Sequence, residues 1–316
     1  MKLVVILVIA AVTGLILFGL RYGQRSSSTG GGRRGSFDSY ESQHQPTPRL
    51  PPAVAATELP SVRLRVAPSA KPHQLGDSRI GGRPDLPKGT PWPIHAGRPL
   101  SFLAQFRLAD VPRPGSLIDL PSDGHLYFFY DVEGMPWGFD PKDRGSWAVL
   151  YAPSGAELAP AAPDPGAKPP HEFKAAAVEF AVEATLPDPM SDVVERLALD
   201  PVDDEDYAAF LRSKEDTDAT LESRILGHPQ LIQNGMQLEC QLASNGIYVG
   251  GPEGYHDPRV AELKRAAADW RLLLQLDSHE DQGMMWGDSG RLYFWIREQD
   301  LRAKRFDRAW LILQCY

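Results

Sequence analysis

The sequence lacks the short motifs that mark most known chemistries. Its 316 residues hold two cysteines, too few for a disulfide framework, and no CxxC or HExxH spacing that would indicate a zinc site. It also lacks a GxxxxGK[ST] phosphate loop and a GxSxG nucleophile elbow. The GxGxxG match at 30–35 lies in a low-complexity stretch with no strand before it, so it does not indicate a dinucleotide site. We therefore predict no cofactor, and we expect Cys240 and Cys315 to be buried thiols because neither has a basic flank.

An excess of positive charge is absent as well. The chain has 33 Lys+Arg against 41 Asp+Glu, a formal net charge of −8. A nucleic-acid-binding protein presents a basic face, so we predict no nucleic-acid partner. The hydrophobic fraction of 42% is ordinary for a globular protein and sufficient for a core.

The longest hydrophobic run lies at the N-terminus. Residues 3–20 carry no charge and would span roughly 27 Å as a helix, close to the hydrocarbon thickness of a bilayer. A cleaved signal peptide has a shorter apolar core and a small-x-small site, and no such site precedes Arg21. We therefore predict a single transmembrane anchor over residues 1–21.

The charges that flank this run predict its orientation. Lys2 alone precedes it, whereas four arginines follow before the first acidic residue, namely Arg21, Arg25, Arg33 and Arg34. The positive-inside rule then places the globular body in the cytoplasm, with the body outside the cytoplasm as the alternative. Residues 22–60 are rich in Ser, Gly and Pro, which is typical of a disordered tether.

The body, residues 61–316, contains an internal repeat. Ser78–Leu86 matches Ser223–Leu231 at six of nine positions, and three further blocks recur in the same order. In the first two of these blocks, Pro99–Leu108 matches Asp269–Ser278 and Gly124–Asp131 matches Gly290–Arg297. In the third, Phe139–Asp140 precedes Trp147 in the first copy, as Phe306–Asp307 precedes Trp310 in the second. We predict two copies of one unit, at about 75–151 and 220–316, separated by an insert at 152–219.

Both copies read as β structure. Each holds three short runs rich in Phe, Tyr, Leu and Val, bounded by Gly, Pro and Asp. We expect one helix from Asp257–Pro258 through Trp270, and helical segments at 190–199 and 203–213. The predicted fold is α+β, with an internally duplicated, mainly antiparallel β body and a few helices, preceded by the transmembrane helix.

These blocks resemble the YwqG-like family, a bacterial family whose name records no established activity. The resemblance covers roughly residues 75–316 and implies a compact, internally duplicated α+β fold. It carries no catalytic residue to this chain. Its motifs are Gly81–Pro93, Phe102–Gln105, Gly124–Phe129, Leu226–Gln233 and Leu273–Ile296.

Five residues are candidates for binding a ligand or partner. Gln105 and Gln275 recur at one position inside apolar strands, and a buried amide there either braces the backbone or faces a ligand. Trp137 lies on a predicted loop, where an exposed aromatic ring indicates a contact surface. Trp286 and Asp288 precede a tight turn, in which the carboxylate either caps backbone N–H groups or contacts a ligand.

The densest polar cluster is the loop that holds His279, Glu280 and Asp281. Its imidazole and carboxylates are a weak candidate for a divalent cation, because a solvated loop between two strands has the same composition. We therefore predict no metal site.

Two functions remain open at this point. The chain is either a membrane-anchored, non-catalytic module that binds a protein, or an enzyme or divalent-metal protein with its site in a cleft between the copies. Two features favour the binding module: the predicted tether, and the absence of a catalytic motif.

Overall fold

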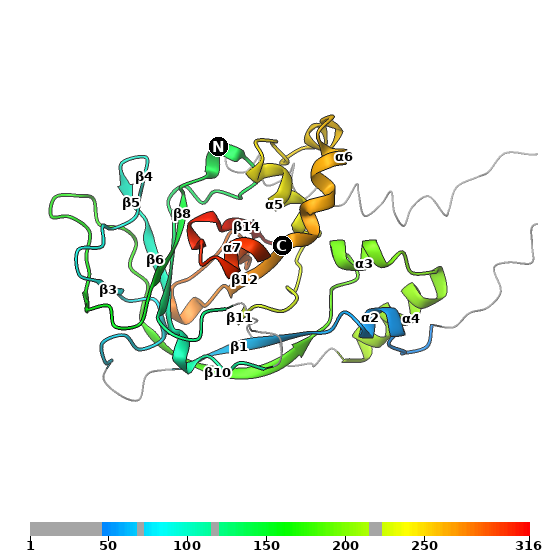
Figure 1. Ribbon diagram of the computed structural model, residues 1–316, viewed down its shortest axis with the longest axis horizontal. Coiled ribbons are helices and arrows are strands. Elements are labelled where there is room, and N and C mark those ends of the chain that lie inside the picture. The colour runs from blue at the N-terminus through cyan, green and yellow to red at the C-terminus, as the bar shows by residue number, and fades with distance from the viewer. Residues whose placement is uncertain (1–45, 68–72, 115–119, 215–222) are drawn as a thin grey trace, which may run out of the picture.

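The computed structural model describes residues 46–67, 73–114, 120–214 and 223–316, which form a mostly antiparallel β body with a few helices (Figure 1). The predicted transmembrane anchor and most of the predicted tether lie outside these ranges. Within them, no helix has the length and apolar character needed to cross a membrane.

The body is built on one ten-stranded sheet with the order β14-β13-β12-β11-β1-β10-β2-β6-β7-β8. Six of these strands coincide with the six runs predicted from the sequence. They are β6 (Ser101–Arg107), β7 (His125–Tyr130), β8 (Trp147–Ala152), β12 (Trp270–Asp277), β13 (Arg291–Arg297) and β14 (Trp310–Gln314).

The centre of the sheet is a long antiparallel pair that the sequence analysis missed. β1 (Leu59–Ala67) runs beside β10 (Ala176–Thr185), which comes from the predicted insert. On its other side, each of these two strands pairs with a two-residue strand of the other half. β1 pairs with β11 (Arg224–Ile225), and β10 pairs with β2 (Arg79–Ile80). The first strand of each half is thereby exchanged into the sheet of the other half.

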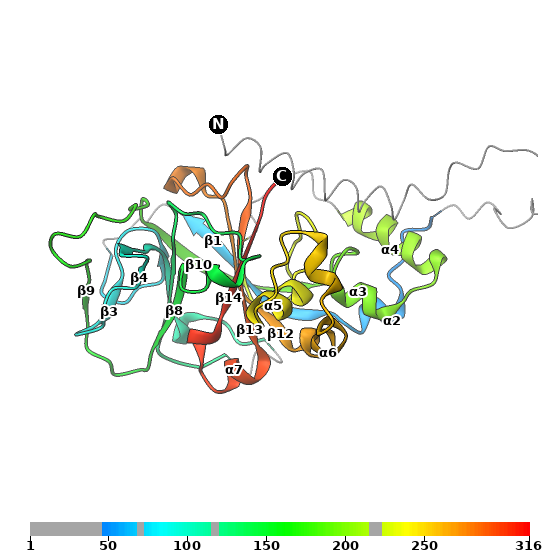
Figure 2. The same ribbon diagram turned by 90° about the horizontal axis from the view of Figure 1, so that it is seen from above.

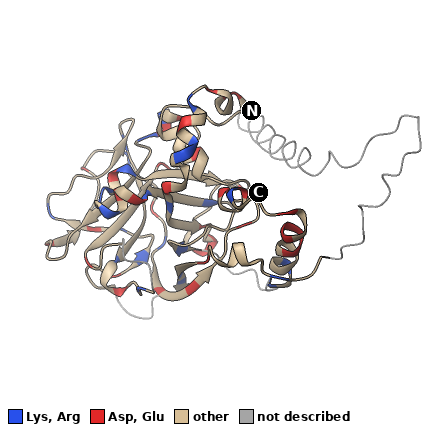
Figure 3. Ribbon diagram, turned by 45° about the vertical axis from the view of Figure 1, so that its right-hand side comes forward, with Lys and Arg blue, Asp and Glu red and all other residues tan. Residues whose placement is uncertain are grey.

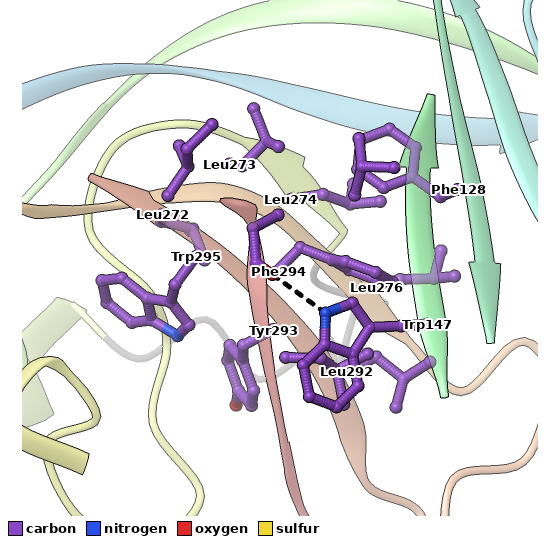
Figure 4. Packing of buried hydrophobic residues seen from close by; sticks show 14 of the residues in the cluster. Phe128, Trp147, Leu272, Leu273, Leu274, Leu276, Leu292, Tyr293, Phe294 and Trp295 are labelled. Atoms are coloured by element: carbon purple, nitrogen blue, oxygen red, sulfur yellow. Dashed lines mark hydrogen bonds between the residues drawn. The ribbon is translucent and has the colours of Figure 1, made fainter. Parts of the chain in front are cut away.

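The sheet curls so that its two ends face each other across a common core. Phe128 of β7 and Phe294 of β13 meet edge to face with ring centroids 5.1 Å apart, and Trp147 and Trp310 do the same at 5.0 Å. Figure 4 shows Phe128 and Trp147 beside the leucines of β12 and β13. Each pair consists of residues at matching positions of the sequence repeat, so the interior between the halves is filled with side chains.

Different segments cover the other face of the two half-sheets (Figure 2). On the first half, Leu86, Phe102, Tyr127 and Phe129 form a second cluster. It lies near two small two-stranded sheets, β3 (Asp85–Pro87) with β9 (Leu158–Pro160) and the hairpin of β4 (Ile94–His95) with β5 (Arg98–Pro99). On the second half, α5 (Gln237–Ser244) packs against β12 and β14.

The helix expected between Asp257 and Trp270 is α-helical only over α6 (Val260–Leu263). The segment continues as the 3-10 helix η5 (Lys264–Asp269), with η4 (Pro252–His256) before it. Asp257 is not the N-cap of α6, which is Arg259, but it lies two residues earlier and its carboxylate accepts the Arg259 N–H at 2.9 Å. A 3-10 helix rises more per residue than an α-helix, so the same residues extend further toward β12. Here the requirement to join β12 overrides the helical pattern.

One of the remaining helices is long, and the others are short. α3 (Asp192–Leu197) and α4 (Pro201–Lys214) correspond to the two predicted helical segments. Figure 3 shows acidic residues along α4. The other elements are α2 (Pro52–Ala55), α7 (Glu298–Arg302), η1 (Leu108–Asp110), η3 (Pro141–Asp143), η6 (Glu280–Gln282) and η7 (Phe306–Arg308).

The last part of the expected tether packs onto the acidic helix. Arg49 donates to the carboxylates of Asp203 at 2.6 Å and Asp206 at 3.0 Å. Val54 of α2 is fully buried in a small cluster with Val194 and Tyr207. The chain therefore makes tertiary contacts from about residue 47 onward, before β1 begins.

Candidate functional site

The two repeated glutamines hold loops of the protein itself. Gln105 is fully buried, and its Oε1 accepts the Asp85 N–H at 2.8 Å while its Nε2 donates to the Asp77 carbonyl at 2.8 Å. The Tyr127 hydroxyl donates to the Asp85 carbonyl at 2.8 Å. Both backbone groups of Asp85 are thus bonded to side chains of the sheet.

The second half repeats this arrangement. Gln275 is also fully buried, and its Oε1 accepts the Gln230 N–H at 2.9 Å. The Tyr293 hydroxyl donates to the Gln230 carbonyl at 2.7 Å. Gln105 and Gln275 therefore brace backbone, each within its own half, and the structure does not bring them together.

The braced residue differs between the halves, as Asp85 in the first and Gln230 in the second. Asp85 is buried and forms an ion pair with Arg79 at 3.0 Å, and His73 Nε2 lies 2.9 Å from the same oxygen. Burial opposes ionisation of this carboxyl, but the hydrogen bonds from Arg79, the Gly76 N–H and His73 outweigh it and lower its pKa. A buried charge cluster therefore exists at this position in the first half.

The loop named as a weak cation candidate does not gather its polar side chains. His279 is buried with its Nε2 2.8 Å from the Ser223 hydroxyl, and burial lowers the pKa of its imidazole. Glu280 and Asp281 are exposed. Across the described ranges, no group of three or more His, Cys, Asp or Glu residues is placed to hold a metal ion.

Trp286 and Asp288 occupy different environments despite being neighbours. Trp286 is fully buried, donates its Nε1–H to the Asp277 carbonyl at 3.0 Å and contacts the rings of Tyr130 and Phe173 edge to face. Asp288 is exposed, and its carbonyl accepts the Tyr316 N–H at 3.2 Å. Trp286 is thus part of the core, and Asp288 is on the surface.

Trp137, in contrast, lies at the surface on a firmly held segment. Its ring is half-buried and stacks on Phe139 with centroids 6.1 Å apart. The carbonyls of residues 137–139 accept hydrogen bonds from Leu313 N at 3.1 Å, Trp310 Nε1 at 2.9 Å and Val249 N at 3.0 Å. Tyr248, next to Val249, is 54% exposed. We call Trp137, Phe139 and Tyr248 the Trp137 surface.

A glycine makes this segment possible. Gly138 has φ +82°, and a Cβ there would lie 1.8 Å from the Leu311 carbonyl oxygen. Any other residue would push the segment off β14. The close approach fixes where the rings of Trp137 and Phe139 sit relative to the sheet.

A small cavity, which the sequence analysis did not anticipate, lies between α3, the 227–237 segment and β12. Its volume is about 80 Å³, and Trp295 of β13 also lines it. Several lining residues belong to the repeated blocks, among them Gly227, Leu272 and Trp295, but these blocks are far apart in the sequence and only the fold brings them together. We call it the α3–β12 cavity.

A buried carboxyl lies on α5, the helix that begins at one wall of this cavity. Glu239 Oε1 is 3.4 Å from the Tyr255 hydroxyl, and its Oε2 has no hydrogen-bond partner among the residues that the structure describes. Burial, together with the nearby charge of Asp192, raises the pKa of Glu239 to about 8. The adjacent Cys240 and the distant Cys315 are both buried thiols, as expected.

Replacing either glutamine by leucine should destabilise the fold rather than remove an activity. Gln105→Leu or Gln275→Leu leaves a buried backbone N–H without its acceptor, which costs about 1–3 kcal/mol of unfolding free energy. Urea denaturation measures this loss. Unchanged stability in both variants would mean that the amides do not brace the loops.

The stability of the protein should fall as the pH rises from about 4.5 to about 8, in part because of Glu239. The folded state keeps the Glu239 proton across this window while the unfolded chain has released it, so the unfolding free energy decreases with pH. Glu239→Gln should remove this part of the slope and be more stable than the parent near the upper end. Urea denaturation at both ends of the window tests this, and parallel pH dependences would contradict it.

The chain was compared with known proteins at the level of families and of single sequences. A family model described as "Domain of unknown function (DUF1963)" matches residues 78–315, from the strand β2 region to the last residue but one. No curated protein matches the chain. The matched region contains both braces, the Trp137 surface and nearly all of the α3–β12 cavity. Since it spans most of the chain, the protein belongs to the DUF1963 family of unknown function.

Proposed function

We propose that this protein is a non-catalytic binding module that recognises a protein partner through the Trp137 surface. The observation that carries the proposal is the stacked, half-buried pair Trp137 and Phe139, on a segment that is hydrogen-bonded to Val249, the neighbour of the 54% exposed Tyr248. Tryptophan and tyrosine are enriched among the residues that contribute most to protein–protein affinity. Their large rings remove much apolar area from water on binding.

The backbone of this surface supports the same proposal. Three hydrogen bonds and the close packing of Gly138 hold residues 137–139 against β14. A surface that is already held in place loses little conformational entropy when a partner binds. A protein partner would therefore meet rings whose positions are fixed by the sheet.

We further propose that residues 3–20 anchor the chain in the cell membrane with the body in the cytoplasm, and that the chain is a YwqG-like protein. The uncharged run and the arginines that follow it support the anchor and its orientation. The repeat motifs support the family assignment. A partner would then be sought among cytosolic proteins near the membrane.

Photo-crosslinking in intact cells tests the binding surface. A benzophenone amino acid in place of Tyr248 should give one discrete crosslinked product, because the ring would lie inside the interface. Val182 of β10 is equally exposed, at 56%, and serves as the matched control position. Trp137→Ala in the Tyr248-labelled chain should reduce the product at least about tenfold, since hot-spot rings contribute 2 kcal/mol or more. Equal products at both positions, or none at Tyr248, would refute the proposal.

Cysteine labelling tests the membrane orientation. Ser27→Cys in the predicted tether should resist a membrane-impermeant maleimide in intact cells and react after lysis. The two native thiols are buried, so the chain without the substitution is the control. Labelling of Ser27→Cys in intact cells would place the body outside the cytoplasm.

A further inference from the structure

The α3–β12 cavity combines apolar walls with unusual polar donors. Leu231, Met236 and Leu272 contribute apolar side chains, and the cavity of about 80 Å³ is partly open to solvent. Arg196, His228, Arg271 and Trp295 are among the residues with side-chain nitrogen atoms that line it. Such a site suits a small molecule that is apolar at one end and accepts hydrogen bonds at the other.

Trp295 carries the first of these donors. Its side chain is buried, at 3% exposure, yet its indole Nε1–H has no hydrogen-bond partner among the described residues. The indole of Trp270, which lines the same cavity, donates to Gln241 Oε1 at 2.9 Å. A buried N–H without an acceptor costs about 1–3 kcal/mol, so an acceptor bound beside Trp295 would recover that free energy.

Arg196 of α3 supplies positive charge at the cavity. Its Nη2 donates to Gln237 Oε1 at 2.9 Å, and it makes no ion pair within 4.0 Å in the part of the chain that the structure describes. Burial lowers the pKa of His228, the hydrogen bond to the Thr57 carbonyl opposes this, and the charges of Arg271, Arg224 and Arg196 lower it further.

The carboxyl at the cavity wall is occupied elsewhere. Asp192 Oδ2 accepts the Gln237 N–H at 2.9 Å, at the start of α5. Burial raises the pKa of Asp192, and the hydrogen bond from Gln237 N–H and the charge of Arg196 oppose that rise. The backbone at the start of α5 therefore already binds this carboxylate oxygen.

The first half contains a matching hollow without these donors. Its volume is about 70 Å³, and Gly82, Arg83 and Phe102 line it at the positions of Gly227, His228 and Leu272. There, Arg83 forms an ion pair with Glu172 at 3.0 Å. The indole of Trp92 donates to the Leu100 carbonyl at 2.9 Å, and Trp295 is matched by Phe129, which has no N–H. The fold thus makes the hollow twice, and among the described residues of the second half the Trp295 N–H has no acceptor and Arg196 makes no ion pair within 4.0 Å.

We propose that the α3–β12 cavity binds a small organic carboxylate with a short apolar tail. The carboxylate accepts hydrogen bonds from Trp295 Nε1 and Arg196, and the tail lies against Leu231, Met236 and Leu272. The volume limits the tail to a few carbon atoms. This site is separate from the Trp137 surface and does not depend on it.

Indole NMR of the full chain in detergent micelles tests the proposal, with sodium butyrate as the probe. The chain has seven tryptophans, and ¹⁵N labelling of their indoles gives each Nε1–H a separate signal. Butyrate should shift the Trp295 signal in a saturable manner and leave the signal of Trp147, in the core, unchanged. Butyramide, which has the same shape but no charge, should bind at least about tenfold more weakly.

Two variants separate binding from folding. Trp295→Phe introduces the residue that the first half has at the matching position, Phe129, so an aromatic ring still fills the site. The variant identifies the Trp295 indole signal, because that signal disappears from the spectrum. It should weaken butyrate binding about tenfold, as measured by calorimetry. Arg196→Gln is an exposed substitution and should weaken binding by about tenfold or more while the other indole signals stay in place. Inorganic phosphate, which has no apolar tail, should compete poorly.

Three results would overturn the proposal. They are a Trp295 signal that does not respond to butyrate, equal affinities for butyrate and butyramide, and butyrate binding that survives both substitutions unchanged. The first would leave the cavity as a hydrated packing void.

Discussion

The contact between matched aromatic rings in the core is the interaction on which the rest of the molecule depends. Phe128 meets Phe294 and Trp147 meets Trp310, each across the interior between the two half-sheets. Edge-to-face pairs of this kind contribute about 0.5–1.5 kcal/mol beyond the burial of their area. They hold the two ends of a ten-stranded sheet against each other, although the edge strands β8 and β14 do not pair. The Trp310 Nε1–H also donates to the Gly138 carbonyl, so a core residue fixes the position of residues 137–139.

Outside this core, the two halves share their framework and differ in their chemistry. The glutamine and tyrosine side chains bind both backbone groups of residue 85 and of residue 230, whatever side chain stands there. Because only backbone groups are bound, the side chain at this position can differ between the halves. It is Asp85 in the first half and Gln230 in the second. The two hollows differ in the same way. Both are lined by a glycine and apolar residues at matching positions, but their hydrogen-bond donors differ.

Much of the sheet could be predicted from the sequence because the six longer strands are apolar runs bounded by Gly, Pro and Asp. β1 and β10 could not, because charged residues alternate along them. Arg65 faces Glu179 across the pair, and both are exposed. An alternating pattern with so few aromatic residues resembles a surface segment as much as a strand.

Some of the candidate site residues could be interpreted from the sequence, and others could not, because their surroundings depend on distant segments. The recurrence of Gln105 and Gln275 favoured a brace, and their hydrogen bonds are those of a brace. Trp137 lies at the surface and Trp286 in the core, although both stand in similar Trp-Gly contexts, because Trp286 reaches Asp277 and Phe173 from distant segments. The α3–β12 cavity is assembled from segments between residues 59 and 295, and only the tertiary fold brings them together.

The exchange of β1 and β10 between the halves has a consequence for synthesis on the ribosome. β1 leaves the ribosome long before its neighbours, since 126 residues separate Leu59 from Thr185 and 164 separate Ser61 from Ile225. The N-terminal half therefore emerges with its first strand unpaired and with β2 lacking β10 at its side. Unpaired strand edges are the surfaces on which nascent chains associate with one another. The β1–β10 pair can form only after residue 185 has been made, and β11 can join β1 only after residue 225, so the centre of the sheet is completed late in synthesis.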